Sequence, residues 1–108
     1  MSLTHSHSKA LYTNIATSLI IHEKIITTLS RAKYLRPFIE NLINTSKNNS
    51  ITSHRHVAEK IKDERARKKL FAVLGPRYAE RTGGYIQILK LAPRSGDSAP
   101  RALVRLIQ

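Results

Sequence analysis

The sequence predicts a small α+β domain with two layers, in which a small three-stranded sheet packs against about four helices. Three observations carry this prediction. Apolar residues recur every three or four positions through most of the chain, four β-branched residues stand together in its first third, and two segments near its end alternate between apolar and polar residues. The expected order is helix, strand, three helices and two strands, with the helices on one side of the sheet.

The first half of the chain is predicted to form a helix, a strand and a second helix. Apolar residues at every fourth position predict the first helix over residues 9–22, preceded by a flexible lead-in at residues 1–8. The run of Ile and Thr predicts a strand over Lys24–Thr28, which is too short to stand alone and must pair with later strands. Thr28 can cap the next helix, and Pro37 either lies in the first turn of that helix or kinks it. The buried face of this second helix is expected to comprise Leu35, Ile39, Leu42 and Ile43.

The middle of the chain is predicted to hold a solvent-exposed loop and two more helices. The polar run Lys47–Thr52 is the loop, because its side chains compete with helix formation by bonding to nearby backbone. Ser53 or Ser50 is expected to cap the third helix, and Asp63 the fourth. Gly75, followed at once by proline, predicts the end of the fourth helix, with the glycine in the left-handed conformation that commonly closes a helix.

Two C-terminal strands complete the predicted sheet. The segment Tyr85–Leu91 alternates between its two faces, and Ala102–Ile107 is its expected partner. The residues from Pro93 to Pro100 form a turn cluster that is too long for a tight hairpin. Because the chain has 108 residues, residues 9–108 are expected to form a single domain, and no internal repeat is present.

The composition indicates a polyanion as the partner. Lys and Arg number 19 against 7 Asp and Glu, which gives a net charge of +12 and an isoelectric point near 10.6. The absence of cysteine excludes disulfides and thiolate metal sites. The longest apolar run, Leu70–Leu74, is far shorter than the roughly 20 residues that cross a bilayer, and no secretory signal is recognised, so neither membrane insertion nor export is expected.

Two stretches carry the candidate contacts to a nucleic acid. Between residues 22 and 36, cations cluster around the first predicted strand. Between Gly75 and Tyr85, two arginines four positions apart would project together from a helical turn, adjacent glycines would bring backbone amides close to a phosphate, and a tyrosine would stack on an unpaired base. The alternative for this second stretch is a helix end and a bend into a strand, with two buried tyrosines, and the residues alone favour neither. The basic segment Lys60–Lys69 is equally balanced between a solvated helix face and a phosphate-facing surface.

Several motifs in register resemble one family. They stand at Leu19–Leu29, Ala32–Pro37, Glu40–Ile43, Leu74–Tyr78, Arg81–Tyr85 and Arg94–Pro100. Their order and spacing are similar to those of the bacterial-type large-subunit ribosomal protein L-seventeen family. The resemblance implies a structural constituent of the large ribosomal subunit that binds ribosomal RNA beside neighbouring ribosomal proteins, in the cytoplasm or in an organelle matrix, and supports subunit assembly and translation without chemistry of its own. Together with the patterns above, it assigns RNA contact to His22, Lys24, Arg31, Lys33, Arg36, Arg77, Tyr78, Arg81, Gly83, Gly84, Tyr85 and Arg94.

The chain departs from the family pattern near both ends. Lys9 is the only Lys or Arg before Lys24, whereas the family usually opens with an Arg-rich arm. Gln87 stands where family members tend to have arginine. Arg101 and Arg105 on the last predicted strand are candidates to supply replacement contacts.

Two other functions remain as alternatives. A basic DNA-binding protein, either nucleoid or regulatory, would share the positive charge and would present a recognition helix. A metal-dependent enzyme would use the histidines, which occur as the pairs His5 with His7 and His54 with His56. Residues two apart do not share a helix face, however, and no nucleophile or carboxylate stands at a telling spacing. The sequence therefore predicts no catalytic residue, metal, cofactor or small-molecule substrate.

Overall fold

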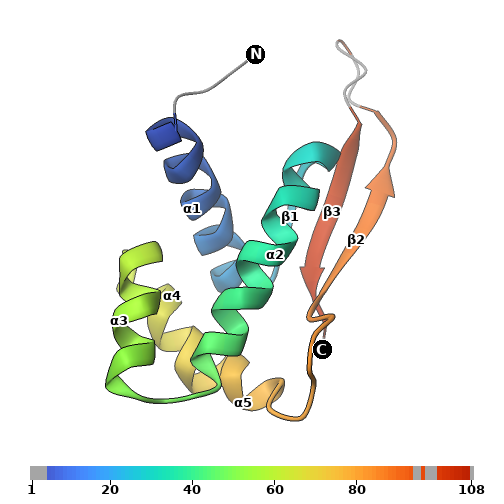
Figure 1. The fold of residues 1–108 in the computed structure, drawn as a ribbon. Coiled ribbons are helices and arrows are strands. Elements are labelled where there is room, and N and C mark those ends of the chain that lie inside the picture. The colour runs from blue at the N-terminus through green and yellow to red at the C-terminus, as the bar shows by residue number, and fades with distance from the viewer. Residues whose placement is uncertain (1–4, 94–95, 97–99, 108) are drawn as a thin grey trace.

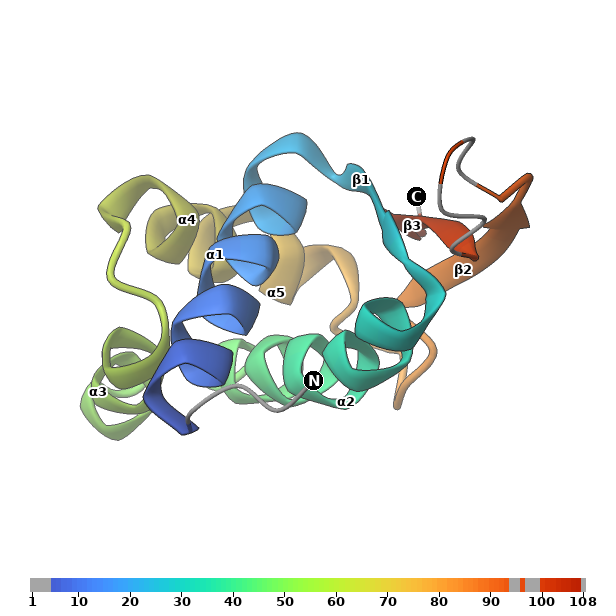
Figure 2. The same cartoon turned by 90° about the horizontal axis from the view of Figure 1, so that it is seen from above.

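The computed structural model describes residues 5–93, 96 and 100–107 and has the expected α+β architecture. The sheet and the helices form two layers, with the helices on one side of the strands in both views (Figures 1 and 2). In chain order the elements are α1 (His5–His22), β1 (Lys24–Thr28), α2 (Leu29–Ser46), α3 (Ile51–Lys60), α4 (Glu64–Lys69), the π-helical turn η1 (Leu70–Leu74), α5 (Gly75–Arg77), β2 (Ile86–Leu91) and β3 (Arg101–Leu106).

The sheet is antiparallel and runs in the order β1-β3-β2, so the last strand of the chain lies at its centre. The predicted sheet is confirmed, because the early strand β1 pairs with the later strand β3 and the two C-terminal strands pair with each other. Val104 lies opposite Ile25 on one side and Ile88 on the other, and these residues face the helices. Tyr85 and Ile107 lie just outside the strands, where the Ile107 amide donates to the Tyr85 carbonyl at 2.9 Å.

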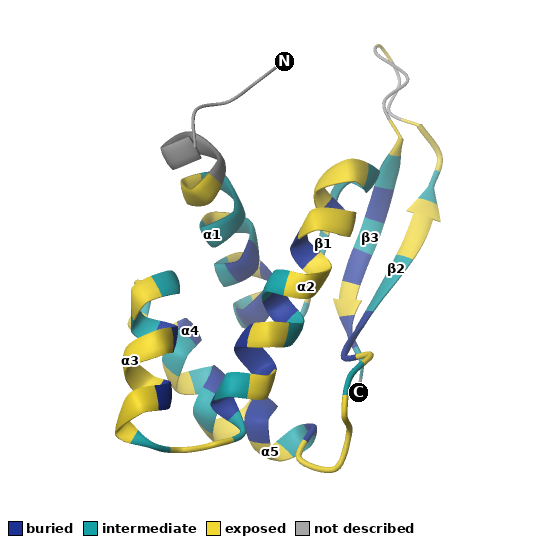
Figure 3. Cartoon of the chain, viewed as in Figure 1, coloured by how far each residue is buried: buried dark blue, intermediate teal, exposed yellow. Residues whose placement is uncertain are grey.

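Helix α2 is the central element of the fold. It contacts α1, α3, η1, α5 and all three strands, and its apolar residues form the middle of the core (Figure 3). The predicted buried face is confirmed, and the Thr28 hydroxyl caps the helix by accepting from the Arg31 amide at 3.3 Å. Because the helix begins directly after this cap, Pro37 lies in the helix interior and not in the first turn.

The helix starts follow the predicted caps, with shifts of a few residues. Helix α1 begins at His5, so part of the expected lead-in is helical, and residues 1–4 lie outside the described residues. Ser50 caps α3 by accepting from the Ser53 amide at 3.1 Å, which makes the preceding loop shorter than expected. The Asp63 carboxylate caps α4 through the amides of Arg65 at 2.8 Å and Ala66 at 3.3 Å.

The predicted helix end at Gly75 is wrong. Gly75 has right-handed helical angles, φ −55° and ψ −54°, its amide donates to the Leu70 carbonyl, and the chain stays helical through Arg77. Glycine is required here for space, since a Cβ would lie 2.8 Å from the backbone oxygen of Ser46 at the end of α2. The π-helical turn and the missing side chain together let the last helical segment pass close to α2.

Candidate nucleic-acid interface

Exposed cations gather where α1 turns into β1. His22 and Lys24 line a cavity of about 670 Å³ together with Arg105 of β3, and all three side chains are exposed. Lys24 lies directly opposite Arg105 in the β1-β3 register, so both project from the sheet face that the helices do not cover. The Nε of Arg105 donates to Oε1 of Gln87 at 2.7 Å, which orients the guanidinium.

Two more arginines, Arg31 of α2 and Arg101 of β3, lie at the other end of β1. Arg31 lines a hollow of about 340 Å³ between α1 and β1, and it lines a second hollow of about 240 Å³ together with Arg101. Arg101 lies opposite Thr28 in the β1-β3 register, on the same sheet face as Lys24 and Ile26. The cationic surface formed by His22, Lys24, Arg31, Arg101 and Arg105 is called the β1 surface below.

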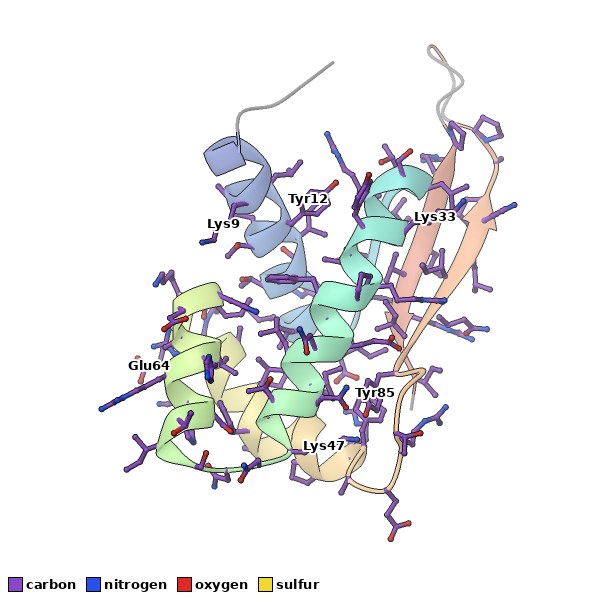
Figure 4. All side chains as sticks on the ribbon, viewed as in Figure 1. Lys9, Tyr12, Lys33, Lys47, Glu64 and Tyr85 are labelled. Atoms are coloured by element: carbon purple, nitrogen blue, oxygen red, sulfur yellow. The ribbon has the colours of Figure 1, made fainter. Side chains whose placement is uncertain are left out.

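Two further predicted contacts lie beside this surface. Lys33 and Arg36 are exposed on α2, and Lys33 is labelled in Figure 4. The structure therefore leaves the cations predicted around the first strand open to solvent. Arg94, the last predicted contact, lies outside the described residues.

Arg77 is placed differently from the prediction, because it binds a carboxylate of the same chain. Its Nη1 and Nη2 donate to the two oxygens of Glu23 at 2.5 and 3.2 Å, and the Nζ of Lys69 lies 2.9 Å from Oε2 of the same residue. Glu23 adopts a φ of 65° at the turn between α1 and β1. Hydrogen bonds from Arg77 and then Lys69 lower the pKa of Glu23 to about 2, against burial, which raises it. This ion pair joins the α1-β1 corner to α5.

The two tyrosines predicted to stack on a base are buried in the core. Tyr78 is 1% exposed and Tyr85 is 0% exposed, and their ring centroids lie 5.0 Å apart. The Tyr78 hydroxyl donates to the Ile107 carbonyl, and Lys47 donates to the Tyr85 hydroxyl with its Nζ 4.6 Å from the ring centroid (Figure 4). Stacking on an unpaired base is therefore wrong for these rings, and Lys47 is part of the packing and not of a solvated loop.

The turn at Gly84 directs two backbone amides toward a carboxylate. The amides of Gly84 and Tyr85 donate to Oε2 of Glu40 at 2.9 and 3.2 Å, so they do not present the expected phosphate cradle. Gly84 has the positive φ, +67°, and Gly83 does not. Arg81 is exposed and its Nη2 donates to the Gly84 carbonyl at 3.2 Å, so it does not project together with the half-buried Arg77, which is paired with Glu23.

Comparison with known proteins identifies the family. The family model described as "Ribosomal protein L17" matches residues 11–107. The chain belongs to this family. It is similar to the large ribosomal subunit protein bL17 of Cereibacter sphaeroides, with 49% identity over 99% of this chain and 77% of that protein. The proteins of the same name from Roseobacter denitrificans and Maricaulis maris are 48% and 47% identical, each over 99% of this chain and 76% of their own length.

Membership of the ribosomal protein L17 family decides between the functions that the sequence left open. The family consists of structural ribosomal proteins and not of enzymes, and the comparisons give no support to a DNA-binding regulator or a metalloenzyme. Among the residues that the structure describes, no three His, Cys, Asp or Glu side chains gather where they could hold a metal. Within the same residues, no helix has the length and apolar character needed to span a membrane.

The sequence marks Arg101 and Arg105 only as candidates for replacement contacts on the last strand. Their spacing contains the missing signal, because residues four apart on a strand lie on the same face. Leu103 lies between them on that face and opposite Ile26, which is 61% exposed. The outward-facing pair Ile26 and Leu103 therefore lies between Arg101 and Arg105 along β3, and this pattern marks β3 as part of the surface.

Proposed function

We propose that this ribosomal protein L17 family member is a structural constituent of the large ribosomal subunit that binds ribosomal RNA through the β1 surface. Its other partners are neighbouring proteins of the large subunit, and its location is the ribosome of a bacterial cytoplasm or of an organelle matrix. The names of its relatives and the net charge of +12 support this proposal.

The observation that carries the proposal is the direct pairing of Lys24 with Arg105 across the sheet. Like charges at directly opposite positions of a sheet destabilise it. A phosphate group between the two side chains converts that repulsion into two favourable contacts. His22, Lys24 and Arg105 line one cavity where α1 turns into β1, so a phosphate can reach all three side chains. The Glu23 carboxylate also lines this cavity, but it is held by Arg77 and Lys69.

Binding in this proposal is driven by neutralisation of phosphate charge and release of counterions. The sheet holds Lys24, Arg105 and Arg101 at fixed spacings, so the surface accepts an RNA backbone of matching shape. No reaction step is needed, because the contribution to the particle is to hold RNA segments in position during assembly and translation.

Filter binding of large-subunit ribosomal RNA over a range of salt concentrations tests the proposal. If roughly 6 to 10 phosphates are neutralised, log affinity should fall with log salt with a slope between about −4 and −9. The double variant Lys24→Ala, Arg105→Ala should reduce that slope by about 1.4 to 1.8. Lys62→Ala, an exposed cation between α3 and α4, is the matched control and should leave the slope unchanged. A wild-type slope near zero, or equal affinity for duplex DNA at the same salt, would contradict the proposal.

A further inference from the structure

A stacked pair of rings lies on the side of the molecule away from the β1 surface. His54 of α3 stacks on Phe71 of η1 with ring centroids 3.7 Å apart and an interplanar angle of 15°. The Nε2 of His54 lies 2.5 Å from Oδ1 of Asn49, and because an amide oxygen only accepts, Nε2 carries the proton. His54 is an exposed residue and Phe71 is half-buried, so the pair is fixed from one side and open from the other.

A groove of about 600 Å³ runs along this ring pair, and its charged lining is mainly positive. The lining residues are Asn49, His54, Glu64, Arg67, Lys68, Phe71 and Ala72. Glu64 is paired with Lys68 at 3.3 Å, and the Nη1 of Arg67 donates to the carbonyls of Ile61 and Lys62 at 2.9 and 2.7 Å. The negative charge of Glu64 is therefore balanced by Lys68. The guanidinium of Arg67, fixed by its two hydrogen bonds, is the remaining charged group beside the rings.

We propose that this His54-Phe71 groove receives an unpaired nucleobase of RNA. A base stacks on any flat π surface, and a ring held parallel to a second ring offers such a surface without reorganisation. The groove volume lies within the usual range for small-ligand sites of about 300 to 1,000 Å³. The adjacent arginine, together with a chain charge of +12, favours a nucleotide over an apolar or basic protein segment.

The groove and the β1 surface lie toward opposite ends of the molecule (Figures 1 and 2). Helices α3 and α4 lie at one end of the molecule and the strands at the other in both views (Figures 1 and 2), and the molecule extends over 46 × 31 × 21 Å. Resting on the proposed RNA binding at the β1 surface, a base in the groove means that one chain joins two separate RNA segments. The β1 surface holds one segment by charge, and the groove holds the other by stacking.

Titration of the free protein with adenosine 5′-monophosphate, followed by NMR, tests the groove directly. The ring protons of His54 and Phe71 should move upfield with this nucleotide and stay in place with ribose 5-phosphate, which has the phosphate but no base. His54→Ala should abolish the shift of Phe71, whereas His54→Phe should retain it because the aromatic surface remains. Equal shifts with ribose 5-phosphate, or no shift at all, would overturn the proposal.

Filter binding of large-subunit ribosomal RNA separates this inference from the proposed function. His54→Ala should weaken affinity roughly 5- to 150-fold, the loss expected for one stacked base, without changing the salt slope. His56→Ala removes a second exposed histidine of α3 that does not line the groove, and it should bind like the wild type. Wild-type affinity in His54→Ala with a steep salt slope would overturn the groove alone. A flat salt slope would instead contradict RNA binding at the β1 surface.

Discussion

The segment Arg77–Tyr85 and the β1 surface contain similar residue types and use them in opposite ways. In the first, Arg77 binds Glu23, the glycine and tyrosine amides bind Glu40, and both tyrosine rings are buried. In the second, Lys24, Arg101 and Arg105 project from the uncovered face of the sheet, and Lys24 stands opposite Arg105. The segment with the stronger sequence motif holds the fold together, and the plainer one is open to solvent.

The few carboxylates of the chain explain this difference. The sequence has 7 Asp and Glu against 19 Lys and Arg, so most basic side chains have no acid of the same chain to pair with. The positions of the few acids therefore determine which basic side chains are paired within the fold and which are left for a binding partner. Glu23 binds Arg77 and Lys69, and Asp63 caps α4. In the β1-β3 register, no Asp or Glu lies opposite a residue of β1. Carboxylate positions, more than the density of Lys and Arg, therefore distinguish cations that pair within the fold from cations that remain open to a partner.

Replacement of Glu23 by glutamine should have the largest effect on the fold. The pKa of Glu23 falls from 4.5 to about 2 in the folded chain, chiefly through the hydrogen bonds from Arg77, and its side chain is 24% exposed. The variant should lose about 2 to 3 kcal/mol of unfolding free energy at neutral pH. Because the folded pKa is the lower one, this stabilisation is present above pH 4.5 and is lost as the pH falls toward 2.

Urea unfolding of both proteins at neutral pH and near pH 2 measures this effect. The difference in unfolding free energy between wild type and Glu23→Gln should be large at neutral pH and smaller near pH 2. Glu64→Gln is the matched control, because its i,i+4 pair with Lys68 is exposed and is worth only about 0.2 to 0.5 kcal/mol. An equal loss in the two variants would show that Glu23 is an ordinary surface carboxylate.

Gly75→Ala should be the next most damaging change. Its Cβ would lie 2.8 Å from the backbone oxygen of Ser46, and a backbone atom cannot move aside as the end of a flexible side chain can. Overpacking of this kind costs about 1 to 3 kcal/mol. Thermal unfolding of the free protein measures this loss of stability. A melting temperature above that of the wild type would mean that α5 does not pack closely against the end of α2.

Gly84→Ala should cost about 1 kcal/mol, because an alanine is strained at a φ of +67°. Gly83→Ala is the matched comparison, since its Cβ would meet nothing within 4 Å and its φ is not positive. Thermal unfolding should therefore separate two adjacent glycines that the sequence motif treats alike. Equal melting temperatures for the two variants would contradict the turn at Gly84.

Local interactions explain which parts of the fold are predictable from sequence. The caps at Thr28, Ser50 and Asp63 act within the first turn of their own helices, so residue type and position indicate them directly. The strand pairing follows from β-branched and alternating patterns in the same way. The helical conformation of Gly75 cannot be predicted from local residue type, because it depends on Ser46, which is distant in sequence and adjacent only after folding.

The candidate site is less predictable for the same reason. Nothing near Arg77 in sequence indicates that Glu23 is its partner, and nothing near Gly84 indicates Glu40. The expected roles of Arg77, Tyr78, Gly84 and Tyr85 assume that a basic and glycine-rich loop faces outward. Those residues face carboxylates and the core, so a phosphate-binding pattern can equally be satisfied by the protein's own acids.

The smallest effects are expected from Arg31→Ala, and they should appear in RNA binding alone. The Arg31 amide bonds to the Thr28 hydroxyl and is retained in the variant, and alanine suits a helix, so the melting temperature should not change. Loss of one phosphate contact should lower the salt slope of RNA affinity by about 0.7 to 0.9.

Arg77→Ala should change the melting temperature and not the salt slope. Removal of the partner of Glu23 lowers the melting temperature and leaves the slope of the remaining folded protein unchanged. Thermal unfolding and filter binding of the two variants decide the comparison. If Arg77→Ala lowers the slope and Arg31→Ala does not, the RNA lies on the Arg77–Tyr85 segment and the β1 surface is a solvated face.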